Sequence, residues 1–238
     1  MLDDQIVILC GGKGTRVRSV IGNKPKILMP ILNKTFLEIQ LVHYYEKGFR
    51  NFFYIVGFGG EQVINELHIF QKRLKDINIS YHSEGNTRLG TGGSILSCID
   101  KLDDKFLLTY GDNFLRLNFK KFSEEFRLST KNYMTIYKNS NLIEPSNVFY
   151  DESKNRIISY DKLKKKKNYK HIDYGFFGII KDSFLSKVPS SPCFDLNIFI
   201  QQSISDDIIA PFFTSDRFYD IGNPGAIEEF INFYSKNL

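Results

Sequence analysis

The chain has 238 residues, enough for one large α/β domain with a sizeable buried core. Its net charge is only +5 and no long one-sided basic stretch occurs, so small anionic substrates suit this balance at least as well as a polymer does. We therefore expect no nucleic-acid partner.

No apolar run approaches the roughly 18 residues that cross a bilayer, and the acidic start "MLDDQ" is unlike a signal peptide. We therefore expect no membrane partner. Cys10, Cys98 and Cys193 form neither a CxxC pair nor a zinc spacing, which is typical of reduced thiols. These features predict a cytoplasmic protein.

Short apolar runs alternate with amphipathic segments in the first half of the chain. The short runs predict buried strands over 5–10, 51–58, 77–82 and 105–110. The amphipathic segments predict helices over 36–47, 61–74 and 91–99, the first of them ending at Gly48. Because this alternation produces parallel βαβ units, we expect a Rossmann-like α/β fold, a mostly parallel sheet with helices on both faces.

Short strands separated by polar turns replace this alternation after about residue 130. The segments "YMTIY", "NVFY", "RIISY" and "HIDYGFFGII" predict a smaller antiparallel lobe, and a last helix is expected over 224–236. No linker, repeat or low-complexity segment interrupts the chain. We therefore expect a single two-lobed domain over 1–238, divided into residues 1–130 and residues 131–238.

A glycine-rich basic loop, "CGGKGTRVR", follows the first predicted strand. Ligands of parallel sheets bind beyond the carboxyl ends of the strands, so this loop belongs at the expected ligand crevice. Its glycines let backbone amides approach an anion closely; they are Gly11, Gly12 and Gly14. Its cations are Lys13, Arg16 and Arg18. Because the loop matches neither a P-loop nor GxGxxG, it is also compatible with an ordinary glycine turn.

A second cationic cluster, Lys24-Pro25-Lys26, lies just downstream and suits a triphosphate better than a single phosphate; Lys24 is expected to be an ordinary loop residue. The stretch "GNTRLGTGGSI" over 85–95 is a second glycine-rich strand-to-helix connection. Thr91 in it offers a polar group or a helix cap. Its glycines would let a flat base lie against the backbone; they are Gly90, Gly92 and Gly93.

Two carboxylates are candidate magnesium ligands. Asp112 in "LTYGDN" comes just after a buried strand, and Asp220 in "RFYDIGNPG" has aromatic and aliphatic neighbours. Mg²⁺ prefers one or two carboxylates together with phosphate oxygens and water, which fits a carboxylate beside a triphosphate. An aspartate that only begins a turn is the alternative at both positions.

The second half contributes Asp161, Lys162 and Asp173, of which Lys162 could hold a second phosphate. The lysine run over 164–167 is expected to be solvated. No Ser-His-Asp or Cys-His arrangement is indicated, because the histidines have no ligand spacing; they are His43, His68, His82 and His171.

Together and in this order, these motifs resemble the sugar-phosphate nucleotidyltransferases, the family that makes sugar nucleotides. "CGGKGTR" is similar to the family's G-G-x-G-T-R signature, Pro25-Lys26 to its P-K pair, and "LGTGG" to its second nucleotide loop. "YGD" and "FYDIGNPG" resemble its metal-binding segments, and "YDK" and "DYG" resemble its E-K-P segment and the following substrate strand. The resemblance covers nearly the whole chain. It implies a Rossmann-like, GT-A-like sheet, with residues 1–130 binding nucleotide and residues 131–238 binding the acceptor.

The resemblance also implies a reaction. A nucleoside triphosphate would condense with a phosphorylated small molecule, above all a sugar 1-phosphate, with release of pyrophosphate. The implied catalytic residues are Arg16, Lys26 and Asp112, and the implied Mg²⁺ ligands are Asp112 and Asp220. The implied nucleotide-binding residues are Leu9, Gly11, Gly12, Gly14, Thr15, Arg16, Glu84, Gly90 and Thr91. The implied acceptor-binding residues are Asp112, Lys162, Asp173 and Gly175.

The chain departs from the family pattern at a few positions and mixes subfamily features. Asp161 and Leu163 stand where the family has Glu and Pro, and Ile27 stands where a second Pro is common. "FYDIGNPGAIEEF" resembles heptose-1-phosphate guanylyltransferases, "TYGD" resembles glucose-1-phosphate cytidylyltransferases, and "GDNF" resembles thymidylyltransferases. An Asp-Asn pair also occurs in phosphocholine-type cytidylyltransferases. The base and the acceptor therefore stay open.

Three other interpretations stay open. They are a cytidylyltransferase for a non-sugar phosphorylated metabolite, a non-catalytic nucleotide-binding regulatory relative, and a glycosyltransferase on a related fold. The retained site residues argue against the regulatory relative. A glycosyltransferase usually carries Asp-x-Asp, whereas Asp112 is followed by Asn113 and Phe114. Exposed aromatic residues of the second half could form a dimer face, so a homodimer is a candidate assembly.

Overall fold

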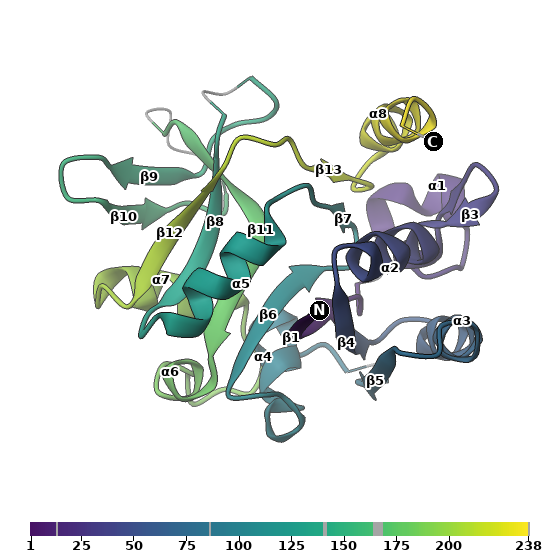
Figure 1. Ribbon diagram of the computed structural model, residues 1–238, viewed down its shortest axis with the longest axis horizontal. Coiled ribbons are helices and arrows are strands. Elements are labelled where there is room, and N and C mark those ends of the chain that lie inside the picture. The colour runs from purple at the N-terminus through teal and green to yellow at the C-terminus, as the bar shows by residue number, and fades with distance from the viewer. Residues whose placement is uncertain (13, 86, 140–141, 164–168, 238) are drawn as a thin grey trace. The chain divides into compact units, whose positions relative to one another are not determined.

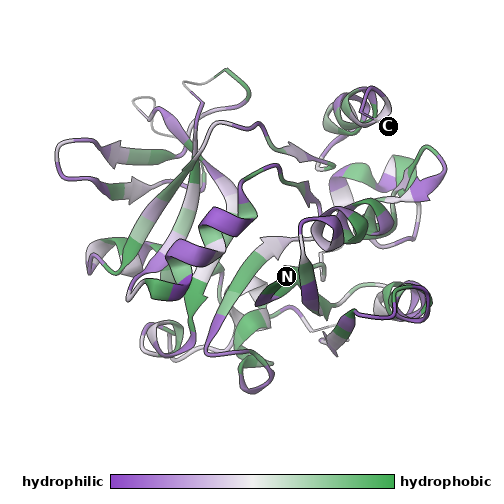
Figure 2. Ribbon diagram, viewed as in Figure 1, coloured by the Kyte–Doolittle hydropathy of each residue, from purple (hydrophilic) through white to green (hydrophobic). Residues whose placement is uncertain are grey.

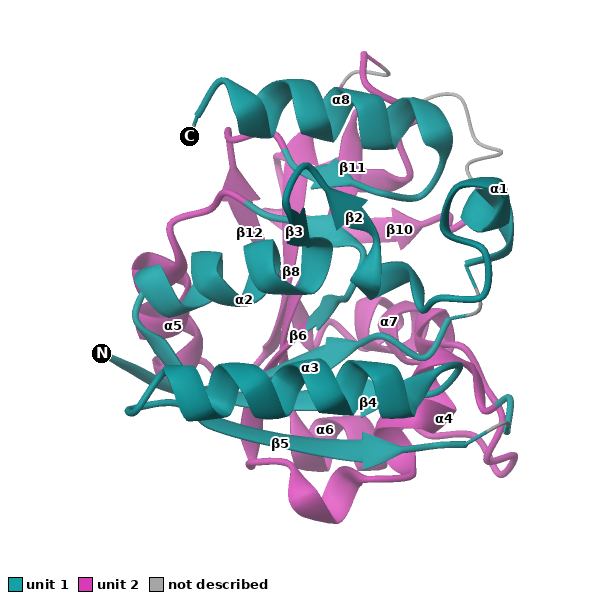
Figure 3. Cartoon of the chain, turned by 90° about the vertical axis from the view of Figure 1, so that its right-hand side faces the viewer, with its two compact units in different colours: residues 1–88, 109–115, 218–238 teal, residues 89–108, 116–217 magenta. Residues whose placement is uncertain are grey.

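The computed structural model describes residues 1–12, 14–85, 87–139, 142–163 and 169–237 (Figure 1). Lys13 and the lysine run over 164–167 lie outside the described residues. The chain forms two compact units (Figure 3). Unit 1 contains residues 1–88, 109–115 and 218–238, and unit 2 contains residues 89–108 and 116–217. The two units therefore interleave along the sequence. Their boundaries differ from the division at residue 130 that the sequence predicted.

Unit 1 contains a parallel βαβαβ arrangement, as predicted from the alternation of strands and helices. β1 pairs with β4 and β4 pairs with β5, both in parallel. The elements are β1 (Leu2–Leu9), α2 (Phe36–Glu46), β4 (Phe49–Val56), α3 (Gly60–Arg73) and β5 (Asn78–Ser83). The predicted end of the first helix is confirmed, because Gly48 has a φ of 102°, a left-handed conformation that favours glycine.

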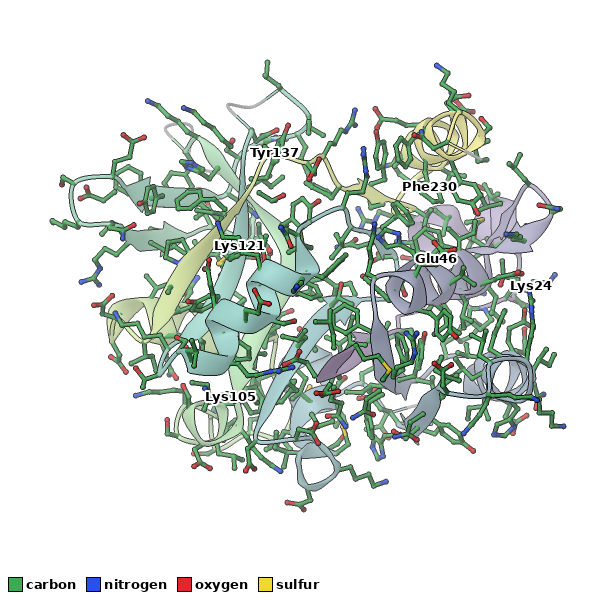
Figure 4. The ribbon with its side chains drawn as sticks, in the orientation of Figure 1. Lys24, Glu46, Lys105, Lys121, Tyr137 and Phe230 are labelled. Atoms are coloured by element: carbon green, nitrogen blue, oxygen red, sulfur yellow. The ribbon has the colours of Figure 1, made fainter. Side chains whose placement is uncertain are left out.

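The remaining elements of unit 1 are short, apart from the last helix. They are the 3₁₀ turns Thr15–Val17 and Lys26–Leu28, α1 (Arg18–Ile21), β2 (Pro30–Ile31), β3 (Lys34–Thr35), β7 (Asn113–Phe114), β13 (Tyr219–Asp220) and α8 (Pro224–Ser235). The Asn223 side chain caps α8 by accepting a hydrogen bond from the Ala226 amide at 3.0 Å. Phe230 projects from α8 toward α2, where its ring lies 5.3 Å from that of Phe36 (Figure 4).

Unit 2 is mainly antiparallel, as predicted. β11 pairs antiparallel with both β8 and β9, and β9 pairs antiparallel with β10. β12, which the sequence analysis did not identify, pairs with β8 in parallel. Its elements are α4 (Gly90–Leu96), the 3₁₀ turn Ile99–Lys101, α5 (Phe119–Leu128), β8 (Asn132–Lys138), β9 (Val148–Asp151), β10 (Arg156–Tyr160), β11 (His171–Ile180), α6 (Lys181–Leu185), α7 (Leu196–Ser205) and β12 (Ile209–Thr214). β6 (Lys105–Tyr110) contributes its first four residues to unit 2 and its last two to unit 1.

The longest helix among the described residues, α3, has 14 residues. None of the described helices combines the length and the hydropathy that a membrane span needs.

A cluster of aromatic rings under α5 forms much of the core of unit 2. α5 is amphipathic, with hydrophilic and hydrophobic residues alternating along it (Figure 2), and Phe119, Phe122 and Phe126 are its buried rings. The ring of Phe122 lies 4.9 Å from that of Phe176 on β11 and 4.9 Å from that of Phe212 on β12, both edge to face. Phe122 therefore joins the helix to two strands of the sheet.

We predict that Phe122→Ala lowers the free energy of unfolding by about 3–5 kcal/mol, because a fully buried ring leaves a cavity that its neighbours fill only in part. Leu128→Ala is the matched control, since Leu128 lies on the same helix and is 89% exposed. Urea unfolding followed by circular dichroism measures both changes. Equal losses in the two variants would contradict this account of the core.

Candidate active site

The glycine-rich loop and the "YGD" segment lie side by side in unit 1. The Gly111 amide donates a hydrogen bond to the Leu9 carbonyl at 2.8 Å. A Cβ at Gly111 would lie 2.8 Å from the Cβ of Cys10, so only glycine allows this approach. The structure thus brings together the segments that follow β1 and β6, at the ends of strands where ligands of such sheets bind.

The loop glycines have different physical roles. A Cβ at Gly11 would lie 3.0 Å from Oε2 of Glu84, and Gly14 has a φ of +59°. Gly12 has neither constraint, because no described atom outside Gly12 and its chain neighbours lies within 4 Å of the position that a Cβ would take. The predicted nucleotide residues Gly11 and Glu84 are therefore neighbours, and the open side of Gly12 leaves room for a ligand.

The basic residues of the loop differ in their contacts. Arg18 donates hydrogen bonds to the Gly22 carbonyl at 2.9 Å and to Oδ1 of Asn23 at 3.1 Å, and its guanidinium lies 4.4 Å from the centre of the Phe58 ring. Arg18 therefore stabilises its own loop. Arg16 and Thr15 are exposed, and Arg16 makes no hydrogen bond or ion pair with the part of the chain that the structure describes.

Lys26, Asp112 and Asp220 form a compact charged cluster. Lys26 Nζ lies 2.5 Å from Oδ2 of Asp112, and these side chains are 14% and 35% exposed. The Ile221 amide donates to the Asp112 carbonyl at 3.0 Å, and Asp220 is paired with Asn113 across β13 and β7. These backbone contacts hold the two predicted metal ligands together, although they are far apart in sequence.

Gly222 completes this cluster. Its amide donates to Oδ1 of Asp220 at 2.5 Å. A Cβ at Gly222 would lie 2.6 Å from the same oxygen and 3.8 Å from Lys26 Nζ. The Lys26 ammonium therefore lies near both carboxylates.

The donor set of this cluster fits a magnesium ion. Two carboxylates lie where a cationic group is already stabilised, and Mg²⁺ needs only one or two carboxylates when phosphate oxygens and water complete its shell. Among the described residues, no three or more His, Cys, Asp or Glu side chains form a metal-binding group. An ion bound here would therefore depend on substrate oxygens for most of its coordination.

Gln40 is a supporting residue that the sequence analysis missed. It is buried within α2, and its Nε2 donates to the Tyr110 carbonyl at 3.0 Å and to the Asn113 carbonyl at 2.6 Å. These bonds bracket the turn that carries Asp112. The sequence did contain a signal for this role, since Gln40 lies between Ile39 and Leu41 on a predicted helix. An amide that is buried among apolar side chains needs hydrogen-bond partners, so it could have been expected to bond to another segment.

In unit 2 the glycines of "LGTGG" pack against the segment 192–196. The amides of Gly92 and Gly93 donate to the Phe194 carbonyl at 3.0 and 3.1 Å. A Cβ at Gly92 would lie 2.3 Å from the Phe194 ring, and one at Gly90 would lie 2.5 Å from the Phe194 carbonyl oxygen. The close approach that these glycines allow is thus to the chain itself, and base binding by Gly90 and Thr91 stays a prediction.

Lys162 forms an ion pair with Asp195, a residue that the sequence analysis did not single out. Asp195 is also the N-cap of α7, where its Oδ1 accepts a hydrogen bond from the Asn197 amide at 2.9 Å. Partial burial acts to raise the pKa of the Asp195 carboxyl, but the hydrogen bonds from Lys162 and the Asn197 amide outweigh it, so the pKa lies below its usual value. Asp195 therefore carries a full negative charge at neutral pH.

The other predicted acceptor residues organise an irregular part of β11. Asp173 accepts hydrogen bonds from the Tyr160 hydroxyl at 3.1 Å and from the Gly175 amide at 2.8 Å. Gly175 has a φ of 75°, and the pairing of β11 with β8 shifts register between Asp173 and Phe177. A hollow of about 560 Å³ in the same unit is lined by Ile158, Ser159, Tyr160, Asp161, Gln201, Ile204 and Ser205.

Comparison with known proteins identifies the family. The nucleotidyl transferase family model matches residues 5–148, so the chain belongs to that family. A D-glycero-alpha-D-manno-heptose 1-phosphate guanylyltransferase from Campylobacter jejuni is 28% identical over 98% of this chain and 100% of that protein. A probable glucose-1-phosphate cytidylyltransferase from Bacillus subtilis is 30% identical over 47% of this chain and 51% of that protein.

A solved structure shares the fold. HddC from Yersinia pseudotuberculosis, crystallised as a complex with GMP-PN, has a TM-score of 0.79 at 22% identity and covers 97% of this chain and 99% of its own. The chain therefore has the mixed α/β fold predicted from its sequence, with a central, mostly parallel sheet and helices. The family resemblance noted in the motifs is confirmed, and the protein is an enzyme of the nucleotidyltransferase class.

The cysteine in the glycine-rich loop should be unreactive. Burial, with a contribution from the Glu84 carboxylate, raises the pKa of the Cys10 thiol well above its usual value, and only a thiolate reacts readily. Cys98 is also buried, whereas Cys193 is exposed. At pH 8 we predict one iodoacetamide adduct on the folded chain and three after unfolding, counted by mass spectrometry. Folded Cys193→Ser should acquire none, and labelling of folded Cys10 would contradict its burial.

Proposed function

We propose that this enzyme condenses a nucleoside triphosphate with a phosphorylated small molecule, above all a sugar 1-phosphate, and releases pyrophosphate. The observation that carries the proposal is the cluster of Lys26, Asp112 and Asp220 beside the glycine-rich loop. In the reaction, an acceptor phosphate oxygen attacks the α-phosphorus in line, and the bond from that phosphorus to the bridging oxygen of the pyrophosphate breaks. Because two anions must approach each other, catalysis would consist mainly of positioning and charge neutralisation.

Unit 1 supplies the residues assigned to the nucleotide phosphates. The amides of Gly11, Gly12 and Gly14 would receive the phosphates, with Leu9 and Thr15 beside them and Glu84 in the base and sugar region. Arg16 would stabilise the charge that develops on the leaving pyrophosphate, and Lys26 would neutralise the α-phosphate. Mg²⁺ held by Asp112 and Asp220 would neutralise phosphate charge and orient the two phosphates.

Unit 2 supplies the residues assigned to the acceptor. Lys162 would bind its phosphate, with Asp173 and Gly175 of the same unit beside it in the proposed set. Asp112, in unit 1, also stays a predicted acceptor residue. Gly90 and Thr91 are assigned to the nucleotide. Asp161, next to Lys162, lines the hollow of about 560 Å³ together with the polar residues Ser159, Ser205 and Gln201, which supports a polyhydroxylated acceptor. Among the described residues, one aromatic ring lines this hollow, that of Tyr160. A quaternary ammonium group is usually bound by a cage of several aromatic rings, so this lining is a poor match for such a group.

The base can be identified by ligand-induced stabilisation. One triphosphate out of ATP, GTP, CTP, UTP and dTTP, with Mg²⁺, should raise the melting temperature most, because a ligand at 100 times its dissociation constant stabilises by about 2.7 kcal/mol. Arg16→Ala should reduce that shift, whereas Lys24→Ala, an exposed cation near the same loop, should preserve it. A triphosphate shift that survives Arg16→Ala unchanged would contradict the assignment of the loop. Pyrophosphate release with phosphorylated acceptors then tests transfer.

We predict that Asp112→Asn lowers turnover at least about 100-fold, the scale on which loss of a charge-stabilising group acts. Its melting temperature should stay near that of the unchanged enzyme, because the backbone contacts of the turn remain. Asp76→Asn, which removes a partly exposed partner of Arg50 in the same unit, serves as the control and should retain full turnover. Pyrophosphate release is the measurement, and near-normal turnover of Asp112→Asn would contradict the role of this carboxylate.

A further inference from the structure

The segment Pro192–Leu196 contacts both the second glycine-rich loop and Lys162, all within unit 2. Toward the loop, the Phe194 amide donates to the Leu89 carbonyl at 2.9 Å, and the Leu196 amide donates to the Thr91 hydroxyl at 2.9 Å. Toward the other side, Asp195 forms its ion pair with Lys162. One short stretch of chain therefore joins a loop assigned to the nucleotide to a lysine assigned to the acceptor.

The Asp195 carboxylate is held in place by two bonds. Its Oδ1 caps α7 through the Asn197 amide, and its Oδ2 accepts from Lys162. A side chain fixed by a helix cap has little freedom to rotate. The ammonium bonded to it is restrained in turn.

Stability alone does not account for this pair. The side chains of Lys162 and Asp195 are 44% and 43% exposed, and ion pairs that are this exposed usually contribute little to the stability of the fold. The cap itself needs no charge, because asparagine caps helices as well as aspartate does. The negative charge at this position therefore acts mainly on Lys162.

We propose that Asp195 is a positioning residue, which holds the Lys162 ammonium in place for the phosphate of the acceptor. The inference rests on the proposed function, since Lys162 is an acceptor-binding residue only in that reaction. An ammonium has three donors, so a bond to Asp195 leaves two for the phosphate. Fixing a free lysine side chain costs rotamer entropy, and a lysine that is already restrained loses less of it on binding.

The first test is steady-state kinetics of Asp195→Asn, which keeps the cap and removes the charge. We expect the KM for the acceptor to rise about tenfold, the change that follows from 1.4 kcal/mol of lost binding. The KM for the triphosphate and the melting temperature should change little. Asp206→Asn is the matched control, because it removes the ion pair of Lys187 at 2.5 Å near the other end of the same helix. It should leave both KM values unchanged.

A double-mutant cycle separates positioning from a general structural effect. If Asp195 acts through Lys162, Asp195→Asn should lower kcat/KM for the acceptor when Lys162 is present. It should have no further effect when it is added to Lys162→Ala. Fully additive effects, or an unchanged acceptor KM in Asp195→Asn, would overturn the inference.

A measurement that needs no turnover tests the restraint of Lys162 by Asp195 independently of the proposed function. All lysines of the chain can be dimethylated with a ¹³C label for NMR, and dimethylation keeps their positive charge. The resonance of Lys162 is identified as the one that is absent from the spectrum of Lys162→Arg. It should move in Asp195→Asn and stay in place in Asp206→Asn. An unmoved resonance overturns the restraint by Asp195 even in an active enzyme. If the resonance moves but the unchanged enzyme transfers no nucleotide to any phosphorylated acceptor, the proposed function fails and the acceptor role of Asp195 fails with it.

Discussion

The partly buried ion pair between Lys26 and Asp112 is the interaction around which the charged cluster of unit 1 is arranged. Removing charges from water is costly, and a partly buried pair persists only where geometry and further hydrogen bonds compensate. Here the compensation comes from the surrounding backbone. Gln40 fixes the two carbonyls that flank the Asp112 turn, and β13 holds Asp220 beside it. The glycines at 111 and 222 let these segments approach closely enough.

Fixed charges of both signs suit a reaction between two phosphates. In the proposed reaction, lysine and arginine would attract the anions while the two aspartates would hold a divalent cation, so the site could neutralise several negative charges without being uniformly basic. The modest net charge of +5 agrees with this, since the positive charge that matters is local. Arg18 shows that a cation in the motif can serve structure instead, because its guanidinium is engaged by its own loop and by Phe58.

The glycines of the two glycine-rich loops are needed for different reasons. Gly14 adopts a left-handed conformation and Gly11 lies against Glu84, whereas Gly90, Gly92 and Gly93 make room for the chain at 192–194. Sequence patterns cannot separate these cases, because a glycine that avoids a clash with the chain looks the same as one that admits a ligand. In unit 2 this packing also places Asp195 next to Lys162, so the second loop supports a residue proposed to bind the acceptor as well.

The sequence by itself determined the elements whose signals are local and the identity of the family. β1, α2, β4, α3 and β5 were predicted to within a few residues, because periodicity and terminal glycines act over a few positions. α5, α7 and β12 were missed, although Phe119, Phe122 and Phe126 have helical spacing and Asp195 has the position of an N-cap. Only the tertiary structure decided which motif residues meet. Lys26 and Asp112 are 86 positions apart, and Lys162 and Asp195 are 33 positions apart. Such contacts depend on how whole strands and helices pack, which no local pattern of residues encodes.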